Sequence, residues 1–221
     1  MANLTADAKK EFDRWSEGYD RNLLQFLFFG PAHRMVLEAI GPEDRRILDI
    51  GCGTGIFANC VLQQFPDTQV WGIDLSDGML RHCRPRCENT GRRFHVVQGN
   101  SERLPFKDDA FDLITCTHSF HHYPSQARVV AEMYRVLRPG GRCLILDGDR
   151  DRWWGWLLYD VLVVMVEGPV QHLTSRGFRH LYRDAGFAGV SQRRRKGPLP
   201  FLLTIGHAAK PRQFEVGPQA A

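Results

Sequence analysis

The amino-acid sequence predicts an α/β fold in which a largely parallel sheet is covered by helices on both faces. Strand-like and helix-like segments alternate between residues 45 and 147, which is the pattern of successive β–α–β units. The predicted strands are short and almost wholly apolar, as expected for strands buried on both faces. Two further predicted strands near the C-terminus are separated only by "GPLP" and therefore favour a hairpin.

The elements can be assigned in chain order. Pro85 is expected to shorten or kink the second helix, and "RPGG" (138–141) is expected to form a turn. Gly186 suits the C-terminal cap of the last helix. The predicted strands are 45–50, 68–75, 93–100, 111–119, 142–147, 189–196 and 200–210. The predicted helices are 55–65, 76–91, 124–137 and 177–187.

The remaining segments suggest one domain with two additions. Residues 1–45 look helical and precede the first strand, and residues 151–175 interrupt the alternation of strands and helices. We interpret 1–210 as a single domain, with 1–45 as a helical lid and 151–175 as an inserted apolar lid over the substrate. Residues 211–221 are expected to form a flexible tail.

Composition excludes several classes of protein. The chain has 221 residues, 43% of them hydrophobic, and a formal charge of +4, which is too mild to argue for nucleic acid. The first residues contain no apolar signal sequence, so a cytoplasmic protein with reduced thiols is expected. Cys83 and Cys87 stand beside His82, but no second ligand pair accompanies them. The sequence therefore predicts no metal site.

A glycine-rich turn follows the first strand in "ILDIGCGTG" (47–55). Gly51, Gly53 and Gly55 permit a tight turn and the close approach of a ligand to the backbone. The dinucleotide fingerprint would need glycine at Ile56, which disfavours a nicotinamide oxidoreductase, and no lysine follows for a P-loop. A plain tight turn remains the alternative, but the acid Asp49 directly before the glycines points to a ligand.

Two further polar positions end the next two strands. Asp74 closes the second strand, where a carboxylate can accept hydrogen bonds from both hydroxyls of a ribose. Ser76 and Asp77 are better placed than Asp74 to cap the following helix. Asn100 and Ser101 follow the third strand and could bind the edge of an adenine. All of these positions fall at the carboxyl ends of strands, where open α/β sheets bind ligands.

The order of five motifs resembles the class I S-adenosylmethionine-dependent methyltransferases. The motifs are "ILDIGCGTG", "GIDLSDGML", "GNSERLPF", "FDLITCTHSFHHY" and "VLRPGG", which together span about residues 44–147. The N-terminal "FDRWSEGYDR" and "LLQFLFFGPAHR" are similar to the ubiquinone/menaquinone biosynthesis methyltransferases and related small-molecule enzymes. The resemblance implies a Rossmann-like, doubly wound sheet of seven strands, mostly parallel, with an antiparallel C-terminal hairpin.

The same resemblance implies a set of cofactor contacts. S-adenosyl-L-methionine would be held at its methionine end by the first acid and the glycines, at its ribose by Asp74, and at its adenine by the residues after the second and third strands. Backbone groups after the fourth strand would lie near the sulfonium, and Tyr19 would close over the methionine end. The implied positions are Tyr19, Asp49, Gly51, Gly53, Gly55, Asp74, Leu75, Met79, Asn100, Ser101, Cys116 and Thr117.

Three histidines are candidates for acid–base chemistry. His118, His121 and His122 follow the fourth strand, and histidine titrates near neutral pH, as a base acting on the acceptor would. The alternative is that His121 and His122 pack or bond the backbone before the next helix. A base is needed only where the acceptor loses a proton on methylation.

The segment Trp153–Gly168 carries three tryptophans and few polar residues. It is too short for a spanning helix, so three interpretations stay open: a lid over an apolar acceptor, ordinary core or a dimer contact, and a peripheral membrane contact. The charged run Arg193–Lys196 is expected on a solvated edge strand. The sequence thus predicts a methyltransferase acting on a small apolar or aromatic acceptor, with a non-catalytic, cofactor-binding regulatory protein as the alternative.

Overall fold

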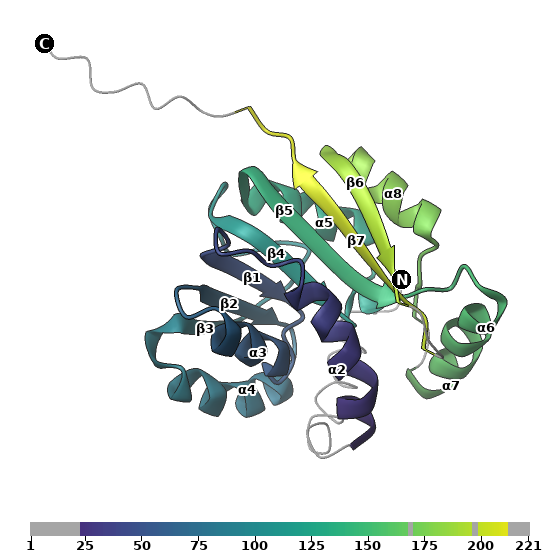
Figure 1. Ribbon diagram of the computed structural model, residues 1–221, viewed down its shortest axis with the longest axis horizontal. Coiled ribbons are helices and arrows are strands. Elements are labelled where there is room, and N and C mark those ends of the chain that lie inside the picture. The colour runs from purple at the N-terminus through teal and green to yellow at the C-terminus, as the bar shows by residue number, and fades with distance from the viewer. Residues whose placement is uncertain (1–22, 168–169, 196–198, 212–221) are drawn as a thin grey trace, which may run out of the picture.

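The computed structural model describes residues 23–167, 170–195 and 199–211 of the chain. Its centre is a seven-stranded sheet with the strand order β3-β2-β1-β4-β5-β7-β6 (Figure 1). Strands β1 to β5 are parallel, whereas β7 is antiparallel to both β5 and β6. The strands are β1 (Arg46–Ile50), β2 (Gln69–Asp74), β3 (Phe94–Gln98), β4 (Phe111–Thr117), β5 (Leu137–Gly148), β6 (Phe187–Arg194) and β7 (Phe201–Ala208). The predicted fold class and C-terminal hairpin are confirmed.

Helices cover both faces of this sheet. Figure 1 shows α2, α3 and α4 on one face and α5 and α8 on the other. The helices are α2 (Leu23–Leu37), α3 (Ile56–Gln64), α4 (Asp77–Asn89), α5 (Gln126–Val136), α6 (Trp153–Trp156), α7 (Val164–Glu167) and α8 (Ser175–Asp184). Shorter helical pieces are η2 (Gly91–Arg93), η3 (Phe120–His122) and the π-helical η4 (Leu157–Val163).

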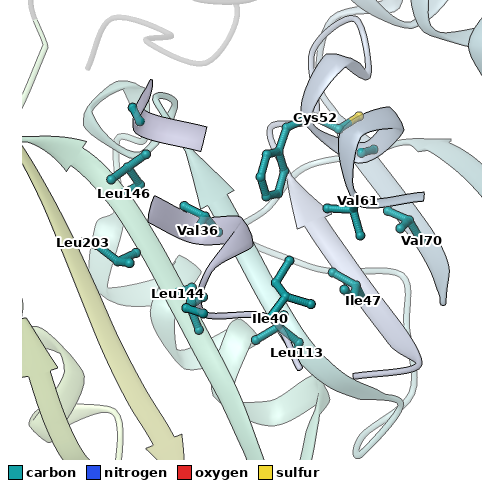
Figure 2. Packing of buried hydrophobic residues seen from close by; sticks show 14 of the residues in the cluster. Val36, Ile40, Ile47, Cys52, Val61, Val70, Leu113, Leu144, Leu146 and Leu203 are labelled. Carbon is teal, nitrogen blue, oxygen red and sulfur yellow. The ribbon is translucent and has the colours of Figure 1, made fainter. Parts of the chain in front are cut away.

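Two apolar cores, one on each face of the sheet, hold the layers together. In the first, Val36 of α2 and Ile40, just after this helix, pack against strand residues such as Ile47 and Leu144 (Figure 2). The second lies under α5 and α8 and includes Phe178, which is also almost fully buried. Each such fully buried aliphatic or phenyl side chain contributes about 1.5–3 kcal/mol. The C-terminal end of α2 is therefore an integral part of the domain.

Local differences from the sequence-based prediction have physical reasons. "RPGG" lies within β5, where a register shift opposite Phe111 and Leu113 accommodates the extra residues as a bulge. Helix α4 continues past Pro85 to Asn89, so the proline does not end it. Helix α8 starts earlier than expected because Thr174 caps it, its hydroxyl accepting a hydrogen bond from the amide of Gly177.

The segment 153–167, which interrupts the alternation of strands and helices, is helical and has both buried and exposed side chains. Tyr159 is buried and donates a hydrogen bond to the carbonyl of Pro200 at 2.8 Å, and its ring covers Gly148 so closely that a Cβ there would lie 2.8 Å from it. Trp153 and Met165, in contrast, are 74% and 79% exposed. Among the described residues, no helix is both long and apolar enough to cross a membrane.

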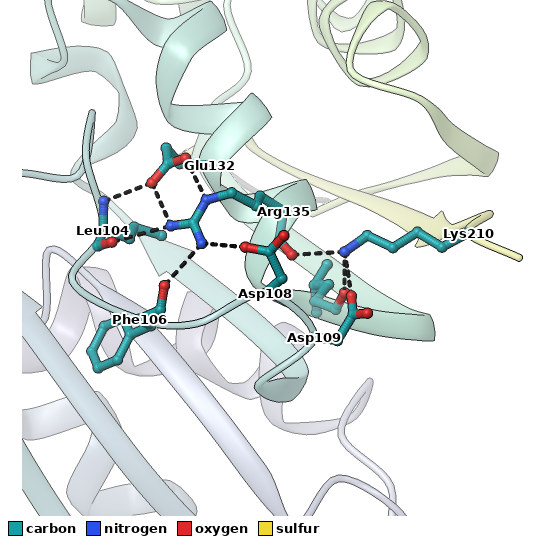
Figure 3. Close-up of polar contacts among 8 residues, drawn as sticks. Leu104, Phe106, Asp108, Asp109, Glu132, Arg135 and Lys210 are labelled. Carbon is teal, nitrogen blue, oxygen red and sulfur yellow. Dashed lines mark hydrogen bonds and ion pairs between the residues drawn. The ribbon is translucent and has the colours of Figure 1, made fainter. Parts of the chain in front are cut away.

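Arg135 of α5 fixes the loop that runs from Gly99 to Ala110 (Figure 3). Its guanidinium donates hydrogen bonds to both carboxylate oxygens of Glu132, to the carbonyls of Leu104 and Phe106, and to the Asp108 carboxylate. Glu132 in turn accepts the amide of Leu104 at 2.8 Å. One side chain thus ties the loop to a helix packed on the core.

Replacing Arg135 with Ala should lower the free energy of unfolding by about 1–3 kcal/mol, because part-buried acceptors lose their donor. Partial exposure of the guanidinium keeps the effect at this modest size. Urea unfolding would measure it. Arg128→Ala on the same helix is the matched control, since that side chain is 76% exposed and lies 4.0 Å from Glu102. Equal stability of the two variants would contradict the structural role of Arg135.

Candidate functional site

A cleft opens at the carboxyl ends of the parallel strands, where the chain leaves β1, β2, β3 and β4. Strands β1 and β4 are neighbours in the sheet, and the strand order reverses between them, which is where such sheets bind ligands. The cleft has an empty volume of about 840 Å³, which includes space open to solvent. Its lining is Gly51, Gly53, Ile73, Asp74, Leu75, Met79, Gly99, Asn100, Ser101, Glu102, Thr117, His118, Ser119, His122, Tyr123 and Pro124.

The three glycines of the turn differ in role. Gly51, Gly53 and Gly55 all have positive φ angles, of 69°, 53° and 80°, which favour glycine. A Cβ on Gly53 would meet nothing within 4 Å, so its bare backbone faces open space. A Cβ on Gly55 would lie 2.6 Å from the sulfur of Cys83. Gly55 therefore allows close packing against α4 and is not among the residues that line the cleft; its contact with the cofactor stays a prediction.

Asp74 joins the turn to the end of β2. One carboxylate oxygen accepts the amide of Gly53 at 2.8 Å, and the other accepts the amide of Ser76 at 2.9 Å. Ser76 caps α4, its hydroxyl accepting the amide of Met79, as the sequence suggested. The predicted ribose-binding carboxylate thus lines the cleft and is held in place by the backbone.

Asp49 lies behind the turn and outside the cleft lining. It is only 1% exposed, and it accepts a hydrogen bond from the Thr115 hydroxyl at 2.8 Å. Burial raises the pKa of Asp49 to about 7; the Thr115 hydrogen bond opposes this shift and the nearby charge of Asp74 adds to it. Asp49 thus lies buried close to the turn, and its direct contact with the methionine end stays a prediction.

The side of the cleft predicted to bind adenine comes together as expected. Leu75 and Met79 line it from the start of α4, and Asn100 and Ser101 line it from the loop anchored by Arg135. The Asn100 side-chain oxygen accepts the amide of Glu102 at 2.8 Å. This bond orders the loop and leaves the amide group of Asn100 as a donor to a ligand.

The end of β4 forms the opposite wall. Thr117 lines the cleft, whereas Cys116 is fully buried beneath it, and its sulfur lies 3.2 Å from the hydroxyl oxygen of Ser119. His118 has a positive φ of 55°, an uncommon conformation for a residue with a side chain. Such backbone strain is concentrated at functional sites.

The three candidate histidines are divided between two places. His118 and His122 line the cleft, but His121 does not. Its ring is 8% exposed, and its Nδ1 lies 2.7 Å from a carboxylate oxygen of Asp147. The His121 ring therefore interacts with this carboxylate and does not line the cleft. His121 lies beside the cleft through its neighbour His122, whose ring centroid is 4.2 Å away.

A run of aromatic rings extends from the cleft toward η4. The His118 ring lies 4.9 Å from Phe201 and 5.7 Å from His33 of α2. On the far side, Tyr159 lies 6.3 Å from Phe201 and 5.1 Å from His172. Burial lowers the pKa of His33 to about 4, so this ring is neutral at pH 7. The region beside the cleft is thus rich in aromatic rings.

Several site residues went unpredicted. Ser119 and Tyr123 line the cleft and are hydrogen-bonded to each other at 3.0 Å. Both residues belong to the sequence motif "THSFHHY", and the polar side chains of this motif could have indicated them as site residues. Gly99, Glu102, Pro124 and Ile73 flank predicted positions. Tyr19 lies outside the described residues.

Comparison with known proteins agrees with this geometry. Residues 48–145 match the family described as "Methyltransferase domain". This part of the chain is thus similar to a methyltransferase domain. A demethylmenaquinone methyltransferase of Thermus thermophilus is 34% identical over 114 residues, which cover 52% of each chain. A ubiquinone/menaquinone biosynthesis C-methyltransferase of Desulfotalea psychrophila is 36% identical over 113 residues, covering 51% of this chain and 45% of the relative. The chain spans about half the length of these curated relatives.

Solved structures share the fold of this chain. A S-adenosylmethionine-dependent methyltransferase from Thermotoga maritima superimposes with a TM-score of 0.73 at 22% identity, covering 91% of this chain and 99% of that one. Another, from Aquifex aeolicus, gives 0.69 at 17% identity, covering 89% and 98%. At such identities the likeness shows the fold alone.

S-adenosylmethionine, the cofactor that the resemblance implies, fits the residues present. The open space at Gly53 admits a ligand to the backbone, and the lining offers carboxylate, amide and hydroxyl groups without a lysine or arginine. Such a set suits a ligand that carries an ammonium and a sulfonium and no phosphate.

The raised pKa of Asp49 predicts pH-dependent binding of this cofactor. Below pH 7 the buried carboxyl is largely protonated, and a cationic ligand favours its ionised form. The dissociation constant should therefore fall about ten-fold between about pH 6 and pH 8, and calorimetry should detect proton release at the lower pH. In Asp49→Asn this part of the pH dependence should vanish, while any contribution of the cleft histidines remains. If the dissociation constant of Asp49→Asn depends on pH as that of the unaltered chain does, the Asp49 carboxyl is not the cause of this pH dependence.

Proposed function

We propose that the protein transfers a methyl group from S-adenosylmethionine to a small aromatic acceptor. The observation that carries the proposal is the bond from the amide of Gly53 to Asp74. It places a bare turn and a carboxylate at one end of a single cleft, while the histidine-bearing end of β4 forms the other wall. An acceptor bound beside His118 and His122 would then lie next to the reactive end of the cofactor.

Each part of the cleft lining would bind one part of the cofactor. Gly51 and Gly53 would approach the methionine end, Asp74 would accept hydrogen bonds from the ribose hydroxyls, and Met79 would pack against the adenine, whose edge would meet Asn100. When bound, the cofactor supplies a methyl group on a positively charged sulfur, which is an excellent leaving group. The protein's contribution is mainly positioning and exclusion of water, which can supply several kcal/mol.

An aromatic acceptor of quinone type is supported by two observations. Rings of His118, Phe201 and Tyr159 form a continuous wall beyond the cleft, and flat rings pack well against such walls. Two of the relatives are named for menaquinone and ubiquinone biosynthesis. The acceptor would therefore present an aromatic ring with a hydroxyl that loses its proton on methylation or is polarised during it.

His122 is the strongest candidate to accept a proton from this acceptor. It lines the cleft and is only partly buried, so it can exchange protons with solvent. His118 also lines the cleft, but its strained backbone makes it a poorer subject for substitution. The inserted segment would bound the acceptor site through Tyr159, whose ring centroid lies 6.3 Å from that of Phe201. The described residues of 151–175 are not among those that line the cleft, and a lid formed by this segment stays a prediction.

The cofactor assignment can be tested at Asp74. Asp74→Ala should weaken S-adenosylmethionine binding by about ten-fold or more, because hydrogen bonds to a charged group are worth about 1.5–3 kcal/mol. Isothermal titration calorimetry would measure the constant, with NAD as a ligand expected not to bind. Asp77→Ala is the matched control, since its carboxylate faces solvent and pairs with Arg81 and Arg84. A folded Asp74→Ala protein with unaltered affinity would overturn the ribose contact.

The chemical step can be tested at His122. His122→Ala should reduce kcat for a hydroxylated aromatic acceptor, such as a reduced naphthoquinone, by about 10²–10⁴-fold. Cofactor affinity should change by no more than a few-fold. The exposed His207 provides the control substitution. Cofactor binding without turnover on any acceptor would favour a regulatory protein, and full turnover in the variant would exclude His122 as the base.

A further inference from the structure

Three side chains that are far apart in the sequence meet beside the cleft. His121 belongs to η3, Asp147 lies near the end of β5, and His172 lies in the stretch before α8. They are 8%, 2% and 4% exposed. One potential ligand atom from each residue lies within 4.8 Å of the other two. Two imidazoles and one carboxylate at this distance form a recognised donor set for divalent transition metals.

Asp147 carries a second, independent sign of a ligand. Its Oδ1 accepts hydrogen bonds from His121 and from the amide of Gly148 at 2.8 Å. Its Oδ2 is buried and has no hydrogen-bond partner among the described residues. A buried carboxylate oxygen without a donor is costly, and a metal ion in contact with it would remove that cost.

The surrounding charges leave the carboxylate available to a cation. The neighbouring Arg150 forms an ion pair with Asp160 at 3.1 Å and donates to the carbonyl of His172. Asp149 is buried and pairs with Arg194 at 3.4 Å. Arg150 and Arg194 are therefore paired with carboxylates other than Asp147.

We propose that His121, Asp147 and His172 bind one divalent transition-metal ion of the Zn²⁺ or Fe²⁺ class. Metal bonds of about 2.0–2.2 Å require the ligand atoms to draw closer together than 4.8 Å. The rings of His121 and His172 are stacked, with centroids 4.4 Å apart and planes at 23°, so one ring must turn to direct its nitrogen at the ion. His172 is the ring that turns, because residues 170–174 form neither helix nor strand.

The site is separate from the three cysteines around α4. Cys52, Cys83 and Cys87 are free thiols, and no group of three ligands that includes them was found among the described residues. The thiols can nevertheless bind soft metals in solution. Any test must therefore distinguish nitrogen and oxygen ligands from sulfur.

The test is metal binding by the purified full chain after treatment with a chelator. Zn²⁺ titrated in a calorimeter should bind at one ion per chain, and Co²⁺ should give visible d–d bands without sulfur-to-cobalt charge transfer. Asp147→Asn and His172→Ala should each weaken Zn²⁺ binding by about 100-fold or more. Mutation of a residue that only hydrogen-bonds to a metal ligand already lowers metal affinity by about 10–100-fold, and the loss of a ligand should have a larger effect. His180→Ala, an exposed histidine on α8, should bind as the unaltered chain does.

A second measurement keeps the result independent of folding defects and of methyltransferase activity. Zn²⁺ should raise the Tm of the unaltered chain, as any ligand of the folded state does, and should not raise that of His172→Ala. Circular dichroism identifies variants that do not fold. Because His172 lies in a loop, the result for folded His172→Ala decides whether the residue binds the metal ion. Unchanged binding in folded His172→Ala, no binding by the unaltered chain, or cobalt spectra dominated by sulfur and abolished in Cys83→Ser would each overturn the proposal.

Discussion

The reversal of strand order between β1 and β4 is the constraint on which the site depends. The two strands are hydrogen-bonded neighbours, but the chain leaves them for helices on opposite faces of the sheet. Their loops therefore diverge and leave a cleft between them. Buried contacts brace the point of divergence: Thr115 of β4 donates to Asp49 of β1, and the hydroxyl of Ser119 donates to the carbonyl of Ile50.

The positions set by the main chain were predictable from the sequence. Apolar strands, a glycine turn and polar residues at strand ends are local signals, and the carboxyl ends of parallel strands must meet at one edge. Gly53, Asp74, Leu75, Met79 and Asn100 accordingly line a single cleft. The same logic located the hairpin at the edge of the sheet, where Arg193 and Arg194 lie on β6.

The side-chain contacts were not predictable, because they depend on packing in three dimensions. Spacing along the chain could not show that Gly55 faces Cys83 while Gly53 faces the cleft. Nor could it separate His121 from His122, which are adjacent in sequence yet differ because one ring turns toward Asp147. His172 had no local signal at all, since its role arises only when the stretch before α8 returns to the end of β5.

Buried carboxylates at the two edges of the sheet differ in how their charge is compensated. At the edge where β4 begins, Asp112 accepts the amides of Arg45 and Arg46 and pairs with Arg138, so its charge is satisfied within the fold. At the carboxyl edge, Asp49 and Asp147 are buried without an arginine or lysine among their hydrogen-bond and ion-pair contacts in the described residues. Burying such charges is costly unless they are paired. A cationic cofactor on one side of the cleft and a metal ion on the other would supply the missing positive charge, so the acids that destabilise this edge in the free protein are also those that select its ligands.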